Sequence, residues 1–274
     1  MRIKAITFNV WDLPFWFIKD RKKRIAGIVQ YLKNSDADII CLQESFDIYH
    51  RAFLCDALKD RYHIAGNTKD HRRILFFKLF DVTGGLVILS KFPILYSRFV
   101  PYNRFLNSAI TEALGRKGFL EVICKTPRGN LKVVNTHMHQ ETLFFSRKIR
   151  LRQTANMLRR TNHDQLPTII AGDFNENYMI REHEFAELFK LTGFLVPSVC
   201  GRKSDSEPTY RPDNRYVDNW LNRIRFPKRY DYVFVKNTDA VGLQVVRYEP
   251  EYLKPPLSDH DPVVLELADD RPCD

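Results

Sequence analysis

Hydrophobic and polar side chains alternate at the start of the chain, and this pattern predicts a β-strand over residues 1–10, MRIKAITFNV. The period then lengthens to that of a helix over residues 21–34, which predicts an amphipathic helix that stops at Asn34. The apolar face of this helix comprises Ile25, Ile28, Val29 and Leu32. By the same criteria we expect a strand over residues 37–44, a helix over 47–59 with Phe53, Leu54, Ala57 and Leu58 at helical spacing, and a strand over 62–66.

Paired strands replace helices in the middle of the chain. Residues 84–93 form an apolar run that stops at Pro93, and residues 118–125 and 131–139 form two more, separated by a turn that contains Pro127 and Gly129. The last two runs therefore predict an antiparallel hairpin. The remaining predicted elements are a helix over 147–160, a buried strand with its loop over 167–177, a helix over 181–191 with Phe185, Leu188 and Phe189 inward, and strands over 230–235, 243–248 and 262–267.

This mixture of helices with parallel and hairpin strands predicts an α/β fold of two packed mixed sheets covered by helices. A length of 274 residues is normal for a single large α/β domain, and we expect one domain over residues 1–274. Residues 197–227 are rich in Pro and Asn and carry no long periodic run. We interpret them as a long irregular excursion within the domain, of a kind that is often functional.

Composition narrows the class of protein and its partners. A hydrophobic fraction of 44% with 28% charged residues is ordinary for a globular chain and excludes a disordered or fibrous one. Lys and Arg outnumber Asp and Glu by 43 to 33, and the net charge of +10 favours anionic partners such as nucleic acid, phosphoinositides or acidic membranes. The basic residues concentrate in 19–24 and 146–160, which are either phosphate-facing patches or, as we expect, the solvated faces of two helices.

Cysteine usage and hydropathy bear on the cellular location. The chain has 5 cysteines and no CxxC pair, so neither a zinc site nor a complete disulfide framework is indicated, and a reducing compartment fits best. The first residues lack the long apolar segment of a secretory signal, and no later stretch reaches the roughly 20 apolar residues of a membrane-spanning helix. We therefore expect a cytoplasmic or peripheral membrane protein.

Polar and ionisable side chains follow the ends of the predicted strands. Each has an ordinary structural explanation, such as a turn cap, a surface acid or a satisfied core histidine. Together they would be costly to bury unless they satisfied one another or a bound ion, so we expect them to share one cleft. These residues are Asn9, Glu44, His137, Asp173, Asn175, Asp231, Asp259 and His260.

The side-chain chemistry of this set indicates a site that binds a metal ion and acts on phosphate. Glu, Asp and Asn oxygens are hard ligands suited to Mg²⁺, whereas the thiolates that would indicate zinc are absent from the set. The two histidines add proton-transfer capacity near neutral pH. The acid and amides of the stretch IIAGDFNEN, residues 169–177, are thus better explained by a metal or phosphate site than by a turn alone.

Over nearly its whole length, the chain resembles the endonuclease/exonuclease/phosphatase superfamily, whose fold is that of deoxyribonuclease I. The family's motifs occur here in the family's order, and the ordered set is much more specific than any single motif. They are Asn9 after the first strand, Gln43 and Glu44 after the second, 85–90 (GLVILS), Asn135 to His137 (NTH), Gly172 to Asn175 (GDFN), 231–235 (DYVFV) and Ser258 to His260 (SDH).

The resemblance implies a four-layer α/β/β/α sandwich with a Mg²⁺ site, in which Mn²⁺ can substitute, where the strand-end loops meet. It implies that Asn9 and Glu44 hold the metal and that Asp259 completes the metal and water network. By the same resemblance Asp173 orients or deprotonates the attacking water, and Asn175 and His137 grip the phosphoryl oxygens. His260, oriented by Asp231, is expected to act in proton transfer or charge stabilisation.

Local motifs are most similar to those of neutral sphingomyelinases. TFNVWDLPFW is similar to the start of that subfamily, QESFD resembles its bacterial members, and THMH is similar to its THLH. The resemblance implies a Mg²⁺-dependent phospholipase C that acts on a phospholipid headgroup. We expect the protein to be a monomer. We expect Phe15, Trp16 and Phe17, beside lysines and arginines, to contact a membrane interface, with the alternative that this aromatic loop is buried in the core.

Two other functions remain open from the sequence. A Mg²⁺-dependent endonuclease acting on DNA or RNA would account for the charge of +10 and the Arg-rich helix, because neutralised phosphates give strong binding. A catalytically inactive member that binds lipids or proteins is the third alternative. It is disfavoured because Glu44, Asp173 and His260 occupy the expected catalytic positions.

Overall fold

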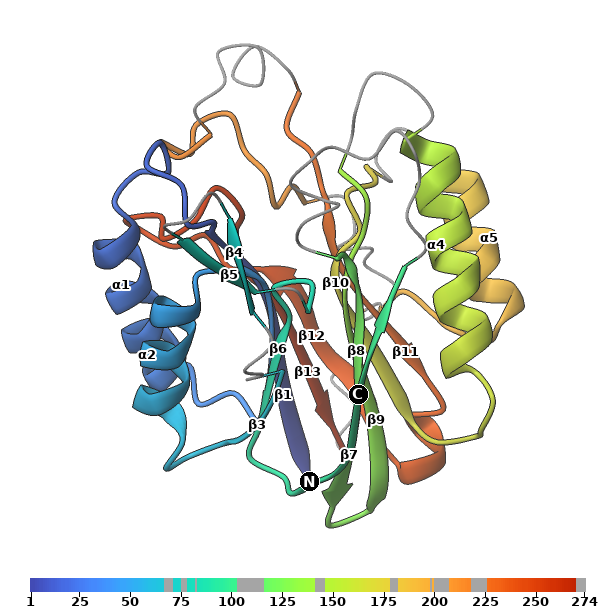
Figure 1. Cartoon of the computed structure of the whole chain (residues 1–274). Helices are drawn as coiled ribbons and strands as arrows, with labels where there is room; N and C mark the ends of the chain where they lie inside the picture. Colours follow the sequence, from blue (N-terminus) through green and yellow to red (C-terminus); the bar gives the residue numbers. More distant parts are fainter. Residues whose placement is uncertain are drawn as a thin grey trace.

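Two mixed β-sheets pack face to face, and a pair of helices covers the outer face of each (Figure 1). The computed structural model describes residues 1–66, 71–74, 78–81, 83–102, 116–140, 146–177, 182–197, 199, 207–217 and 226–269. The helices are α1 (Arg21–Asn34) and α2 (Ile48–Leu58) on one sheet, and α4 (Ser146–Thr161) and α5 (Glu182–Leu191) on the other. This four-layer arrangement confirms the predicted α/β/β/α sandwich.

The first sheet has the strand order β12-β13-β1-β2-β6-β3. Its strands are β1 (Arg2–Asp12), β2 (Ile39–Ser45), β3 (His63–Ala65), β6 (Val87–Ser90), β12 (Gln244–Pro250) and β13 (Val263–Ala268). β1 and β2 run parallel, and the other neighbours are antiparallel. The last described strand, β13, therefore lies beside the first.

The second sheet has the order β11-β10-β9-β8-β7, with β9 and β10 parallel and the other pairs antiparallel. Its strands are β7 (Ile94–Pro101), β8 (Gly118–Thr126), β9 (Gly129–His137), β10 (Thr168–Asp173) and β11 (Asp231–Lys236). A separate antiparallel pair, β4 (His71–Ile74) with β5 (Lys78–Asp81), and a short 3₁₀ helix, η2 (Asp239–Val241), complete the described elements.

Three apolar layers separate the four structural layers. One lies between the sheets and includes Ile39 and Val133, while a second, with Ile28, lies under α1 and α2. The third, under α4 and α5, is built on aromatic rings, and Phe189 stacks on Phe234 with ring centroids 3.6 Å apart. Burial of this apolar area is the main force that fixes both sheets and thereby their strand ends.

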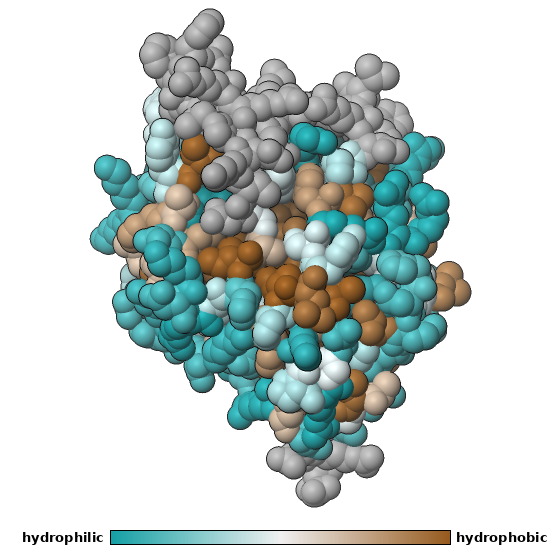
Figure 2. Space-filling model, turned by 60° about the horizontal axis from the view of Figure 1, so that its bottom comes forward, coloured by the Kyte–Doolittle hydropathy of each residue, from teal (hydrophilic) through white to brown (hydrophobic). Residues whose placement is uncertain are grey.

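The predicted elements are confirmed with small shifts of their ends, and the structure adds strands that the pattern did not predict. β7 was missed because, as an edge strand, it leaves Leu95 and Tyr96 exposed and shows no clean alternation. Hydrophobic side chains reach the surface in the middle of the face turned forward in Figure 2. On α2, Phe53 points outward at 52% exposure, whereas Leu54 and Leu58 are buried as the helical spacing predicts.

Candidate active site

The predicted polar residues meet where strands of both sheets end. In the second sheet, Asp173 pairs in register with His137 on β9 and with Asp231 on β11, so three functional side chains lie side by side. In the first sheet, β1 and β2 end together, with Asn9 in register with Gln43. Parallel neighbours bring the ends of β1 and β2, and of β9 and β10, to one edge of the sandwich.

One feature joins the two sheets at this edge, and another allows β10 to approach β9 closely. The Gln43 amide donates to Asn135 Oδ1 at 2.7 Å, and Asn135 Nδ2 donates in turn to the carbonyls of Leu42 (2.8 Å) and Val87 (2.9 Å). These bonds join the sheets directly below the site. Gly172 is required because its φ is +151° and a Cβ there would lie 2.0 Å from a β9 carbonyl oxygen.

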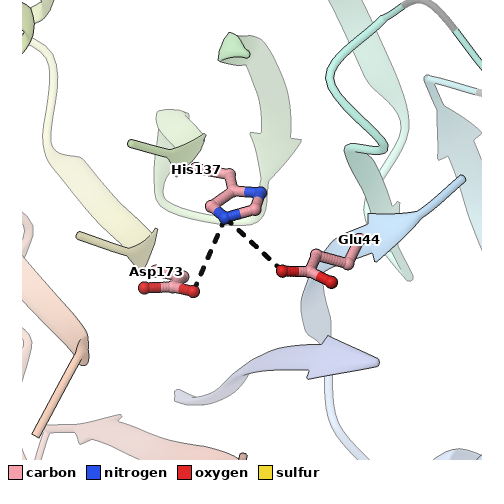
Figure 3. A group of neighbouring side chains, drawn as sticks. All are labelled: Glu44, His137 and Asp173. Carbon is pink, nitrogen blue, oxygen red and sulfur yellow. Dashed lines mark ion pairs between the residues drawn. The ribbon is translucent and has the colours of Figure 1, made fainter. Parts of the chain in front are cut away.

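The centre of the site is a group of three side chains, Glu44, His137 and Asp173 (Figure 3). His137 Nε2 lies 3.7 Å from Glu44 Oε1 and 3.6 Å from Asp173 Oδ2. Asn9 Nδ2 bridges the same carboxylates, at 3.2 Å from Glu44 Oε1 and 2.9 Å from Asp173 Oδ2. Glu44 has φ +56° and Asn175 has φ +51°, left-handed values that cluster at functional sites.

Burial controls the protonation of this group. Burial raises the pKa of Asp173 to about 6, with the charge of Asp231 adding to the effect, and burial also raises the pKa of Glu44. Burial lowers the pKa of His137 well below its ordinary value, and the charges of Lys117 and His260 lower it further. His137 is therefore neutral near pH 7 and free to accept or donate through its ring nitrogens.

His260 forms the second half of the site. Its Nδ1 lies 2.7 Å from Asp231 Oδ2, and the same carboxylate oxygen accepts from Thr209 Oγ1 at 2.6 Å. Its Nε2 lies 3.9 Å from Asp173 Oδ2. Burial acts to lower the pKa of His260, but the negative charges of Asp231, Asp259 and Asp173 outweigh it and raise the pKa well above the ordinary value. An imidazolium thus faces the central carboxylates.

The remaining predicted residues lie around these two groups. Asp259 is half-buried, and burial together with the charge of Glu44 raises its pKa to about 6. Asn175 donates its side-chain amide to the Met138 carbonyl at 3.2 Å, and its backbone N–H donates to Asp173 Oδ1 at 2.8 Å. Every polar residue singled out in the sequence is therefore placed at this one edge.

The donor set fits a hard divalent cation. Glu44, His137 and Asp173 offer ligand atoms that all lie within 4.8 Å of one another. Glu44 Oε2 is buried and accepts no hydrogen bond from any residue in the described part of the chain. Two carboxylates, one of them with an orphaned oxygen, suit such a cation. Asn9 turns its amide nitrogen to the carboxylates and its Oδ1 to Trp11 N (3.0 Å), so ligation through Oδ1 requires the amide to turn over.

Lys117 is a charged residue beside the site that the sequence analysis missed. Its half-buried side chain donates to the Met138 carbonyl at 2.7 Å, and its positive charge acts on Glu44, His137 and Asp173. The run GRKGF, residues 115–119, carries no motif that would mark it. Only the folded chain brings this ammonium group to the carboxylates.

The aromatic loop, residues 13–18, lies beside the site at the end toward which β1 runs (Figure 1). Trp16 is 89% exposed and Phe17 57% exposed, while Phe15 is half-buried and stacks on Phe17 with ring centroids 5.3 Å apart. Pro14 and Ile18 are buried and anchor the loop. The exposure of Trp16 and Phe17 excludes the alternative that the whole loop is buried in the core.

The two basic runs are only partly solvated. Lys22 and Lys23 are exposed as expected, but Arg24 is 1% exposed. In the second run, Arg150 is buried and pairs with Glu176, with Nε to Oε2 at 2.7 Å. This pair ties α4 to the loop that follows Asp173. The expectation of two solvated helix faces is therefore wrong for these arginines.

Sequence comparison decides the family. Residues 6–260 match the Endonuclease/Exonuclease/phosphatase family. The chain belongs to this family. The match covers every predicted site residue and confirms the resemblance inferred from the strand-end motifs. It also confirms the predicted class of enzyme, the phosphoester hydrolases for which the family is named.

Two curated relatives are similar over most of this chain. An inositol phosphosphingolipids phospholipase C of Schizosaccharomyces pombe is 27% identical over 230 residues, covering 79% of this chain and 50% of the relative. Sphingomyelinase C 2 of Leptospira interrogans is 26% identical over 296 residues, covering 96% and 46%. The chain thus spans about half the length of these relatives.

Solved structures support the same fold. SmcL superposes with a TM-score of 0.70 at 22% identity, covering 98% of this chain and 99% of the other. A Staphylococcus aureus beta toxin variant with bound magnesium ions superposes with a TM-score of 0.68 at 20% identity, covering 97% and 99%. At these identities the likeness establishes the fold alone.

Proposed function

We propose that this chain is a Mg²⁺-dependent phosphodiesterase of the neutral sphingomyelinase type, a phospholipase C that releases a phosphorylated headgroup from a phospholipid. The observation that carries the proposal is the placement of the Glu44, His137 and Asp173 group opposite the His260–Asp231 pair. This site lies beside a loop that exposes Trp16. The named activities of the two curated relatives support a phosphosphingolipid as the substrate.

Glu44 and Asp173 are the residues that would hold Mg²⁺, with Asn9 and Asp259 beside them. When bound, the cation supplies Lewis-acid stabilisation of the negative charge on the phosphoryl oxygens. The bound cation would also offset the electrostatic repulsion between the two buried carboxylates. Asp173, with a pKa of about 6, is ionised near neutral pH and suited to orient a water molecule and accept its proton.

The other side chains complete an in-line displacement. Water attacks phosphorus, the bond from phosphorus to the lipid alkoxide breaks, and the alkoxide takes up a proton. His260 is held protonated beside Asp231 and suits proton donation or stabilisation of charge at that oxygen. His137 and Asn175 would contact the remaining phosphoryl oxygens.

The aromatic loop is the proposed membrane contact. Trp16 and Phe17 are exposed, and the exposed side chains of Lys19, Lys22 and Lys23 follow them closely in the sequence. Exposed rings beside cations suit the boundary between headgroups and acyl chains. Within the described residues, no helix combines the length and apolarity needed to cross a bilayer. Reversible contact through this loop would give the site access to a lipid substrate.

A side-by-side assay tests the proposal. The purified chain is incubated with sphingomyelin vesicles, inositol phosphosphingolipid vesicles and supercoiled plasmid, each with Mg²⁺ or with a chelator. We expect Mg²⁺-dependent release of a phosphorylated headgroup from one of the vesicles, and none from the Asp173→Asn variant. Plasmid nicking without headgroup release would replace this proposal with the endonuclease alternative.

A further inference from the structure

Arg24 is almost fully buried although it lies in the most basic run of the chain. It is in the first turn of α1, and 1% of its surface is exposed. Burial of a guanidinium group is costly unless its donors are satisfied. The position of Arg24 therefore depends on the acceptors around it.

The first set of acceptors lies on either side of the aromatic loop. Arg24 Nη2 donates to the Trp11 carbonyl at 2.8 Å, and Nε donates to the Lys19 carbonyl at 2.9 Å. Nη1 donates to the Val10 carbonyl near the end of β1 at 2.9 Å. A single rigid fork thus joins the chain that enters the loop to the chain that leaves it.

The same guanidinium reaches the turn that carries His260. Nη1 also contacts the Leu257 carbonyl at 3.3 Å, one residue before Ser258. Ser258 Oγ donates to the Asn9 carbonyl at 2.7 Å, and its own carbonyl accepts from Asn214 Nδ2 at 2.8 Å. Arg24 therefore lies at the point where β1, the aromatic loop and the turn of residues 257–260 meet.

Two aromatic rings enclose the guanidinium. Its carbon lies 4.8 Å from the Trp11 ring centroid and 5.4 Å from that of Tyr216. The Tyr216 hydroxyl donates to Asp20 Oδ2 at 3.1 Å, on the far side of the loop. Cation–π contact with a desolvated guanidinium is stabilising, and both rings exclude water from its hydrogen bonds.

We propose that Arg24 is a positioning residue of the active site, which holds the aromatic loop and the turn of residues 257–260 in one fixed arrangement. This inference rests on the proposed function, in which the loop meets the lipid and the turn carries Asp259 and His260. A lysine at this position would keep the charge. Its ammonium donates from one nitrogen and cannot span the carbonyls of Lys19, Trp11 and Leu257.

Amide hydrogen exchange tests the link independently of activity. In Arg24→Lys we expect the amides of residues 10–20 and 257–261 to exchange together, about tenfold faster than in the wild type. The matched control is Asp164→Asn, which removes the negative charge 2.6 Å from another buried cation, Lys132, near the start of β9. This control should lose stability without faster exchange in either segment.

Tyr216→Leu is a second variant in case Arg24→Lys does not fold. It removes one ring and the hydroxyl that donates to Asp20, but no acceptor of Arg24, so the same two segments should loosen to a smaller extent. Faster exchange confined to one of the two segments, or in neither, would overturn the inference.

Turnover gives the second readout. On vesicles we expect kcat of folded Arg24→Lys to fall about ten- to a hundredfold, because small displacements of reacting groups are costly, with a weaker apparent affinity for vesicles as well. An unchanged kcat despite looser segments would refute the positioning role. If the wild type hydrolyses no phosphodiester, the proposed function fails, and hydrogen exchange still decides whether Arg24 links the two segments.

Discussion

At the scale of single residues, the site geometry keeps His260 protonated, because nearby carboxylates raise its pKa. Replacing His260 with Gln removes the imidazolium but keeps a side chain of similar shape. We expect kcat to fall about 10²- to 10³-fold, as for loss of one preorganised donor at a developing negative charge. The control is His163→Gln, at an exposed histidine after α4, which should retain full activity. Comparable rates for the two variants would remove His260 from the mechanism.

The pH dependence of activity follows from Asp231. Because Asp231 helps to raise the pKa of His260, the protonated form persists above its ordinary range, and activity should decline only as the pH rises through that raised value. In Asp231→Asn the pKa of His260 falls, so the decline should begin at lower pH. The measurement is kcat against pH for both proteins. A basic limb at the same pH in both would contradict the assignment.

Lys117, which belongs to no motif, is predicted to contribute to activity through its positive charge. Its charge favours the ionised forms of Glu44 and Asp173, so Lys117→Met should raise the pKa of both, and the loss of a positive charge beside the site should weaken binding of the anionic phosphate. We expect kcat/KM to fall about tenfold or more, in line with loss of one stabilising charge near the reacting group. Lys117→Arg keeps the charge and should recover most of the loss. Equal activity of Lys117→Met and wild type would exclude a role.

At the scale of elements, the aromatic loop separates membrane binding from chemistry. Trp16→Ala should weaken co-sedimentation with vesicles, because an 89% exposed ring contributes area only at an interface. Hydrolysis of a water-soluble phosphodiester should stay unchanged. Tyr96→Ala removes an aromatic ring that is 45% exposed on β7, away from the loop, and is the matched control. Vesicle binding that is unaffected by Trp16→Ala would show that another surface makes the contact.

At the scale of the whole molecule, buried acids couple stability to pH and metal. Asp173 and Asp259 have pKa values raised to about 6, so without a cation the folded state binds more protons than the unfolded state between about pH 4 and 6. Stability in chelator should therefore fall as the pH rises through this window. Mg²⁺ binds the ionised carboxylates and should raise the melting temperature more at pH 7.5 than at pH 5.

Thermal melts with Mg²⁺ or chelator at the two pH values measure this effect. Asp173→Asn carries no ionisable group at that position, so its stability in chelator should depend less on pH and its response to Mg²⁺ should be smaller. If Mg²⁺ does not change the melting temperature of the wild type at either pH value, a metal site at these carboxylates is contradicted.

Local periodicity explains why most elements were predictable. The helices α1, α2, α4 and α5 bury faces that repeat every three or four residues, and the inner strands alternate or run apolar throughout. The edge strand β7 gave no such signal because only one side of it meets the core. The pairing of β13 with β1 likewise could not be predicted from local patterns, because it joins segments at opposite ends of the chain.

The sequence by itself determined the order of elements and the polar residues at the strand ends, because both are written in short, contiguous patterns. Only the tertiary structure decided which basic residues are buried. Lys22 and Arg24 belong to the same run, yet one is solvated and the other buried. The difference arises because the cost of a buried charge depends on the carbonyls and carboxylates around it, and those come from distant segments.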